Sequence, residues 1–132
     1  MKRAFVFVAF CLMFILLLSS LGLSSSPKAH HLIIKVTSSD PGEKIAFEAA
    51  YIFKKGAANL KVLNQTTPVT IEETAEFVSA IFHKVSGKAN LRVELLSATD
   101  STTTASDAAW GDIIVLGTHL GKNGVGYFAQ SY

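Results

Sequence analysis

The sequence predicts an α/β domain: an open, mainly parallel sheet of about four strands, with helices on both faces. Two observations predict this class. Segments of strand type alternate along the chain with segments of helical spacing, and such alternation brings strands together in parallel through right-handed crossovers. In addition, the last predicted strand, at residues 112–116, ends in an unbroken branched apolar run, which is typical of a strand that helices cover on both faces.

The first predicted helix covers residues 40–56. Asp40 is a good N-cap, Pro41 suits the first helical position, and Gly56 is a typical residue for a helix end. Between them, apolar residues recur at helical spacing: Ile45, Ala49, Ile52 and Phe53. These features together predict a helix with one buried face.

The second predicted helix covers residues 70–87. Thr70 and Glu73 form a capping box, and Gly87 closes the helix. Behind the capping box, apolar residues repeat at spacings of four, three, four and three: Ile71, Ala75, Val78, Phe82 and Val85. The same segment is rich in residues of high strand propensity, so the alternative fold is an all-β sandwich, which requires residues 45–53 and 77–85 to be strands.

Three further strands complete the prediction, at residues 31–36, 59–63 and 91–95. The last of these alternates between apolar and charged residues, so we expect it to have one wet face and to lie toward an edge of the sheet. Residues 105–110 are expected to form a short helix.

The N-terminal segment, residues 1–24, has the composition of a secretory signal peptide. Lys2 and Arg3 precede a stretch from Ala4 to Leu18 without a polar side chain, and small residues follow. The apolar stretch also has the roughly 20 residues that a membrane-spanning helix needs, so an uncleaved transmembrane anchor is the alternative. Residues 25–132 then form a single α/β domain that is secreted, periplasmic or membrane-anchored outside the cytoplasm.

Composition excludes several function classes for this domain. Cys11 is the only cysteine, so residues 25–132 have no disulfide, thiolate metal site or cysteine nucleophile. Without Lys2 and Arg3, ten basic residues balance ten acidic ones, which argues against nucleic-acid binding. No Gly-x-Ser-x-Gly elbow presents a serine nucleophile, and no residue is predicted to be catalytic or metal-binding, so we expect the domain not to be an enzyme.

Three segments resemble the universal stress protein family, whose α/β fold is related to nucleotide-binding domains. Residues 32–39 look like its first strand and loop, residues 48–57 like the end of its first helix, and residues 112–126 like its last-but-one strand and phosphate loop. The resemblance implies a stress-response protein that lacks the family's final strand. If the sheet order follows the family, residues 112–116 become an exposed apolar edge, and pairing through that edge predicts a homodimer. It also implies ATP or another adenine nucleotide as the ligand, although Thr37 stands where ATP-binding members carry an acidic residue.

The candidate site is the crevice between two loops that we expect to leave neighbouring parallel strands at the same sheet edge. Glycine N–H groups and Lys122 suit a phosphate or carboxylate, Asn123 offers a hydrogen bond, and protonation of His119 strengthens anion binding. The predicted ligand-binding residues are Thr37, Ser38, Ser39, Gly117, Thr118, His119, Gly121, Lys122, Asn123 and Gly124. We therefore expect a domain that binds a nucleotide or another small anionic ligand without catalysis. The alternative is a structural or protein-interaction module with a degenerate crevice.

Overall fold

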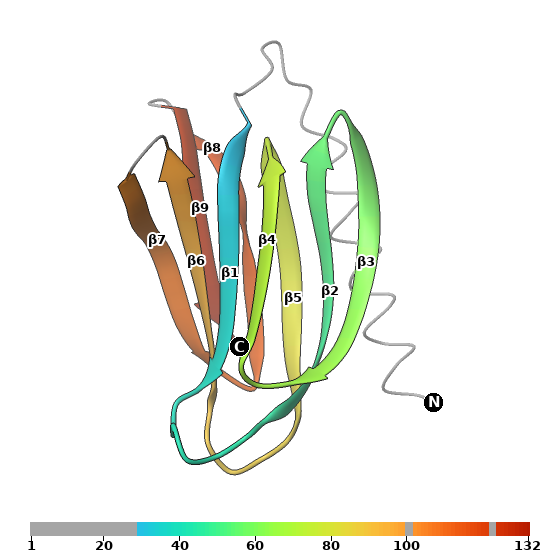
Figure 1. Cartoon of the computed structure of the whole chain (residues 1–132), viewed down its shortest axis with the longest axis vertical. Coiled ribbons are helices and arrows are strands. Elements are labelled where there is room, and N and C mark those ends of the chain that lie inside the picture. Colours follow the sequence, from blue (N-terminus) through green and yellow to red (C-terminus); the bar gives the residue numbers. More distant parts are fainter. Residues whose placement is uncertain (1–28, 100–101, 122–123) are drawn as a thin grey trace.

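The computed structural model describes residues 29–99, 102–121 and 124–132, and this part of the chain is all β (Figure 1). Its strands are β1 His30–Ser38, β2 Ala46–Lys55, β3 Ala57–Thr66, β4 Val69–Ala75, β5 Phe77–Ser86, β6 Leu91–Thr99, β7 Thr102–Gly111, β8 Ile113–Gly121 and β9 Gly124–Ser131. They form two sheets, called sheet A, in the order β4-β1-β6-β7, and sheet B, in the order β3-β2-β5-β8-β9. All neighbouring strands are antiparallel.

The predicted α/β fold is therefore wrong, and the alternative β-sandwich describes the chain. Both segments predicted as helices are strands, β2 in the first and β4 with β5 in the second. The short helix predicted at residues 105–110 lies within β7. Without crossover helices the strands reverse direction in turns, so no parallel sheet forms.

A spacing of four residues misleads in β2 because it fits both a helix and a strand. Phe47, Ala49 and Phe53 are buried in the core between the sheets, and Tyr51 packs against the same core. These alternate residues share one face of the strand, so Ala49 and Phe53 satisfy both periods. The helix-capping signals belong to turns instead: Asp40 accepts a hydrogen bond from Gly42 N at 2.9 Å, and Gly56 has a φ of 75° between β2 and β3.

The irregular spacing in the second predicted helix comes from a corner between the two sheets. Ala75 ends β4 in sheet A, and Phe77 begins β5 in sheet B. The residues of β5 that face the shared core keep even spacing, as Val78, Ala80 and Phe82 do, and the one-residue corner at Glu76 inserts the first odd step. The second odd step, from Phe82 to Val85, ends on an exposed residue of β5. Glu76 N donates a hydrogen bond to Lys54 O at 2.8 Å, which fixes the corner against β2. Two short strands joined in this way imitate the period of one helix.

The other strands lie where the sequence predicts them, but their neighbours differ. β1, β3 and β6 contain the predicted segments 31–36, 59–63 and 91–95. β6 has the expected wet face yet lies between β1 and β7, so its predicted edge position is wrong. β8 lies between β5 and β9, so the predicted edge at residues 112–116 is also wrong.

The core fills the space between the inner faces of the two sheets. Leu32, Ile34 and Val36 of β1 are fully buried, and the Phe47 and Phe82 rings from sheet B lie 6.2 Å apart. A second, smaller cluster lies on the outer face of sheet B, where Ala50, Ile81 and Val115 are buried with Phe128 packed against them. β8 thus contributes apolar side chains to both faces, which explains the unbroken apolar run without covering helices.

The prediction of a transmembrane helix is corrected as far as the structure describes the chain. Across residues 29–99, 102–121 and 124–132 no helix is long and apolar enough to cross a membrane. Residues 1–24, on which the leader prediction rests, lie outside the described residues.

The two sides of the sandwich differ (Figure 1). On one side, called the closed side, β7 of sheet A lies against β9 of sheet B. A Cβ added to Gly111 at the end of β7 would lie only 3.0 Å from the Ser131 Cβ of β9. On the other side, called the open side, β3 and β4 end their sheets. Among the described strands, β3 pairs only with β2, and β4 pairs only with β1.

Candidate functional site

The structure does not bring together the two loops of the predicted crevice. β1 ends at Ser38, which pairs with Leu91, and Leu91 in turn pairs with Gly111. β8 begins beside Gly111 and runs the length of its sheet to Gly121 (Figure 1). Residues 37–42 therefore lie at one end of the described structure, and Gly121 at the end of β8 lies at the other. The physical reason is the antiparallel order, which sends the two strands in opposite directions.

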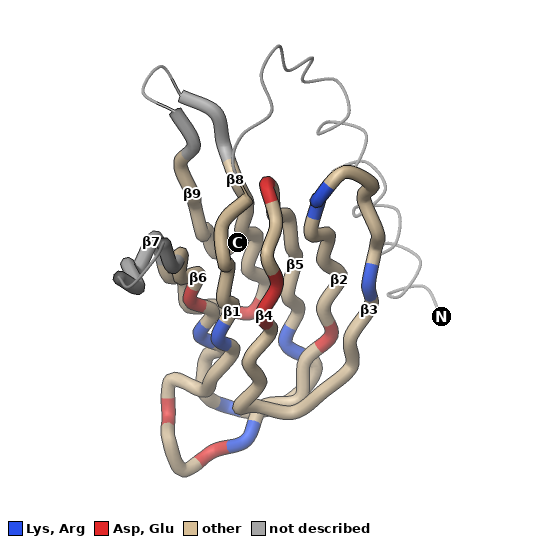
Figure 2. Tube along the Cα trace, turned by 45° about the horizontal axis from the view of Figure 1, so that its top comes forward, with Lys and Arg blue, Asp and Glu red and all other residues tan. Residues whose placement is uncertain are grey.

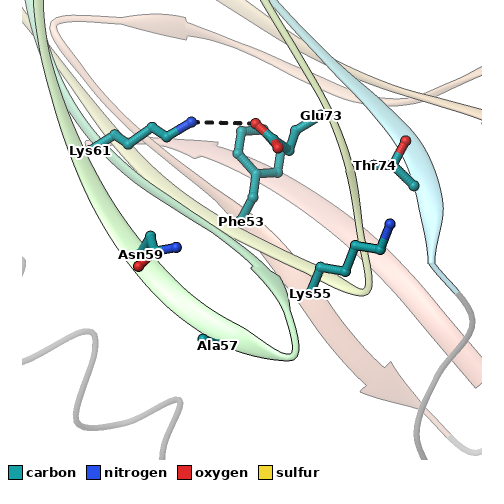
Figure 3. Close-up of a pocket in the computed structure, with 7 residues that line it drawn as sticks. All are labelled: Phe53, Lys55, Ala57, Asn59, Lys61, Glu73 and Thr74. Atoms are coloured by element: carbon teal, nitrogen blue, oxygen red, sulfur yellow. Dashed lines mark hydrogen bonds and ion pairs between the residues drawn. The ribbon is translucent and has the colours of Figure 1, made fainter.

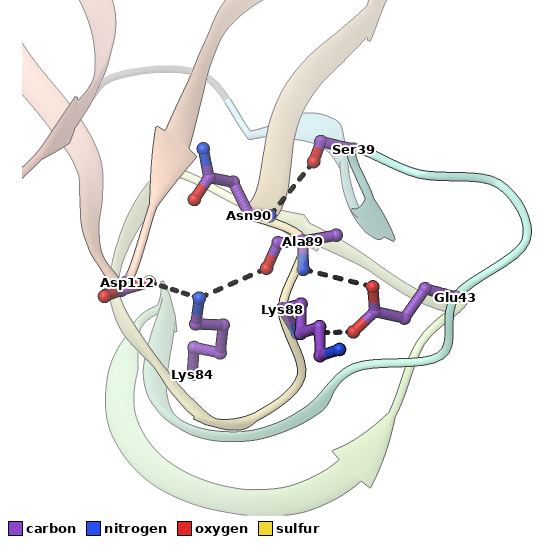
Figure 4. Close-up of polar contacts among 7 residues, drawn as sticks. All are labelled: Ser39, Glu43, Lys84, Lys88, Ala89, Asn90 and Asp112. Atoms are coloured by element: carbon purple, nitrogen blue, oxygen red, sulfur yellow. Dashed lines mark hydrogen bonds and ion pairs between the residues drawn. The ribbon is translucent and has the colours of Figure 1, made fainter.

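The hydroxyl groups predicted to bind an anion hold two loops together instead. Ser38 Oγ accepts a hydrogen bond from Asp40 N at 3.1 Å. Ser39 Oγ accepts one from Asn90 N at 3.0 Å, and Ser39 N donates to Asn90 O at 2.9 Å (Figure 4). Thr37 lies within β1 and pairs with Arg92 of β6. These contacts join the β1–β2 loop to the β5–β6 loop.

The predicted glycine-rich loop is mostly strand. Gly117 lies inside β8, where an added Cβ would come within 3.0 Å of the Phe128 ring, and buried Thr118 accepts a hydrogen bond from Val78 N at 3.0 Å. His119 and Gly121 also belong to β8, and Gly124 begins β9. Lys122 and Asn123 lie outside the described residues.

A polar cluster closes the end of the sandwich near Ser39 (Figure 4). The Glu43 carboxylate accepts hydrogen bonds from Lys88 N and, at 3.1 Å, from Ala89 N. Lys84 Nζ donates to Ala89 O at 3.1 Å and forms an ion pair with Asp112 at 2.5 Å. Glu43, Lys84 and Asp112 each bind a group in a neighbouring loop or strand. We therefore interpret this cluster as a structural contact between loops rather than a binding site.

The open side carries a small groove, called the mouth, between β3 and β4 (Figure 3). Its cavity volume is about 160 Å³, and its lining residues are Phe53, Lys55, Ala57, Asn59, Lys61, Glu73 and Thr74. Lys61 Nζ of β3 lies 3.4 Å from the Glu73 carboxylate of β4, so one ion pair spans the two sheets. Tyr51 meets the Phe53 ring edge-on at 5.7 Å, which steadies the apolar wall of the groove.

β3 is exposed on both of its faces as well as along its free edge. Of its residues only Leu63 is partly buried. Val62 is 72% exposed and Leu60 is 48% exposed on the outer face, where they continue the apolar row that begins at Ala50 of β2. An exposed edge strand presents unpaired N–H and C=O groups that another strand can use.

The two strands of the open side differ in charge (Figure 2). Lysines stand on β3 and at the β2–β3 turn, as Lys54, Lys55 and Lys61, whereas β4 carries Glu72 and Glu73. Glu72 projects from the outer face of sheet A and lies 3.3 Å from His31. The open side therefore has one basic edge and one acidic edge.

No sequence pattern marked Lys55, Asn59, Lys61 or Glu73 as binding residues. Residues 59–63 were predicted to be a strand, but the exposure of that strand depends on its position at the end of sheet B, which follows from the strand order. Within the described residues no three His, Cys, Asp or Glu side chains gather as metal ligands would. Comparisons with known protein families, curated proteins and solved structures found no match, so the resemblance to universal stress proteins stays a prediction.

Proposed function

We propose that this chain is an exported, non-enzymatic protein-interaction module that binds another polypeptide by strand addition at its open side. The observation that carries the proposal is β3, which among the strands that the structure describes pairs on one edge only and is exposed on both faces. Strand addition gives affinity through main-chain hydrogen bonds, so it needs no deep pocket. Lys61 of β3 and the acidic residues of β4 add a means of choosing the partner.

The size of the mouth favours a polypeptide over a nucleotide. Small-molecule sites usually have volumes of about 300–1,000 Å³ and enclose most of the ligand. The mouth has about 160 Å³ and lies open between two edge strands. It therefore suits one or two side chains of an added strand better than a whole nucleotide.

Strand acceptance is tested by NMR titration of the dilute protein with a short capped peptide of alternating threonine and valine. This peptide has no charge, so it probes the free edges without relying on a particular partner. We expect amide shifts concentrated in β3 and β4, with little change in β7 and β9. Absence of shifts at millimolar peptide, or shifts confined to the closed side, would contradict the proposed function.

A matched variant makes this test sharper. Substituting Val62→Pro places a residue without an N–H in the exposed edge strand, whereas Val85→Pro alters an exposed position at the end of β5. Both variants are compared with the parent by circular dichroism before titration. We expect Val62→Pro to reduce the peptide-induced shifts of β3 and Val85→Pro to leave them unchanged.

A further inference from the structure

Resting on the proposed function, we infer that the strand added at the open side is β3 of a second copy of this chain. The two copies form a two-fold dimer in which β3 of each pairs with β4 of the other. Each sheet B is then continued by the sheet A of the second copy. The inference rests on the direction, the charge and the relative height of these two strands.

The strand directions allow this arrangement. β3 and β4 end their sheets on the same side of the sandwich and run in opposite directions (Figure 1). A two-fold axis parallel to the strands, placed beside the open side, exchanges the two layers and preserves strand direction. It therefore sets β3 next to β4 of the second copy as an antiparallel pair. The same operation forms the reciprocal pair, so the contact is closed and does not propagate into a filament.

The Lys61–Glu73 ion pair fixes the register. Lys61 Nζ lies 3.4 Å from the Glu73 carboxylate, so the two side chains, both on inner faces, reach a common height between the sheets. Rotation about an axis parallel to the strands keeps that height. Lys61 of the second copy then lies across from Glu73, and Glu73 of the second copy lies across from Lys61.

The neighbouring positions fit the same register. Counting along the antiparallel strands from this pair, Leu63 of the second copy stands opposite Ile71 on the inner face. Both residues are partly buried against the core already, so they form an apolar cross-strand pair. On the outer face, Val62 of the second copy stands opposite Glu72.

The charges select this dimer over pairing of β3 with β3. In a β3–β3 pair, Lys61 of one copy approaches Lys61 of the other, and β4 with Glu72 and Glu73 would likewise face β4. Like charges across an interface oppose association, whereas the β3–β4 pair sets basic residues against acidic ones. The outer face of sheet B is also apolar, and packing of two such faces is a further arrangement that the experiment separates.

Cysteine cross-linking tests the register. In a Cys11→Ser background no other cysteine remains in the chain. Val62→Cys and Glu72→Cys lie on outer faces of different sheets, so one chain cannot join them, but the proposed dimer brings Val62 of one copy opposite Glu72 of the other. We expect the double variant to form a disulfide-linked dimer under mild oxidation. Val62→Cys with Thr70→Cys, displaced along β4, should cross-link much more slowly.

Charge variants test the same contact without a covalent bond, by sedimentation of the protein purified from an exporting host. Lys61→Glu and Glu73→Lys should each raise the dimer dissociation constant by about tenfold or more, because both symmetry-related contacts become repulsive. Mixing the two variants restores opposite charges across the interface, although neither chain has its internal ion pair. We therefore expect the mixture to form a heterodimer.

Val62→Lys separates the alternatives, because it places a lysine opposite Glu72 and should preserve the dimer. If Val62→Lys abolishes association, the contact lies on the apolar outer face of sheet B. If Lys61→Glu has no effect on association, β3 pairs with β3. Either result overturns the inference. A chain that stays monomeric at high concentration also overturns it. If the uncharged peptide still shifts β3 and β4 in that monomer, the proposed function stands and only self-pairing fails.

Discussion

The closed side and the open side of the sandwich differ in how the ends of the two sheets are covered. Each has a pair of strands that end the two sheets, β7 and β9 on one side and β3 and β4 on the other. On the closed side the two strands lie against each other, and Gly111 permits a contact with Ser131 that leaves no room for a side chain. On the open side one exposed ion pair joins the two strands, and a shallow groove lies between them.

This difference separates a sheet edge that stabilises the fold from one that is available for association. Natural sheets usually protect their edges by covering, twisting or charging them. The closed side is covered within one chain. The open side keeps a ten-residue strand with a single charged residue, Lys61, along its free edge. A second strand would give the open side the cover that the closed side already has.

The largest effect is expected in the core that both sides share. Phe82 is fully buried and packs beside Phe47. Phe82→Ala should lower the free energy of unfolding by about 3–5 kcal/mol, because it leaves a cavity between the sheets. Urea denaturation followed by tryptophan fluorescence measures this loss. A loss below about 1 kcal/mol, the size expected of a surface substitution, would contradict the position of the core.

A smaller effect should distinguish the two sides directly. Gly111→Val on the closed side should destabilise the fold by about 1–3 kcal/mol, because the new side chain overlaps Ser131. Ala57→Val, an equal addition of β-branched character on exposed β3, should change stability by no more than about 0.5 kcal/mol. Equal losses in the two variants would remove the distinction between the sides.

The smallest stability effect is expected at the mouth. Lys61 and Glu73 are 53% and 43% exposed, so Lys61→Ala should change the free energy of unfolding by only about 0–1 kcal/mol. The same substitution should weaken dimer formation measurably, because it removes both contacts with Glu73 of the second copy. A large loss of stability with unchanged association would assign the pair a purely structural role.

Strand locations could be predicted from the sequence where alternation was clean. β1 and β6 each place alternate apolar residues in the core, as Leu32 and Ile34 or Leu91 and Val93 do. Helices were predicted wrongly where the spacing of apolar residues fits both the helical period of about 3.6 residues and the strand period of two. Ala49 and Phe53 stand four apart in a strand, and the one-residue corner at Glu76 supplied the first of the two odd steps of the predicted helix.

The site was harder to predict than the strands, because it depends on which elements become neighbours. Residues typical of helix N-caps also occur in turns and strands. Asp40 accepts a hydrogen bond within a turn and Thr70 lies in β4, and only the strand pairing shows these positions. A loop rich in glycine suggested an anion site, yet Gly117 serves the packing of Phe128. The mouth has no local motif, since Lys61 and Glu73 meet only after the two sheets assemble.

Hydrogen exchange measured by mass spectrometry over a range of protein concentrations tests the central claim most directly. We expect the amides of β3 to exchange rapidly in dilute protein and to become protected, together with those of β4, as concentration rises from micromolar to millimolar. β9 should keep the same protection throughout, because the closed side is covered within one chain. Protection of β3 that does not change with concentration, or a change confined to β7 and β9, would contradict the account.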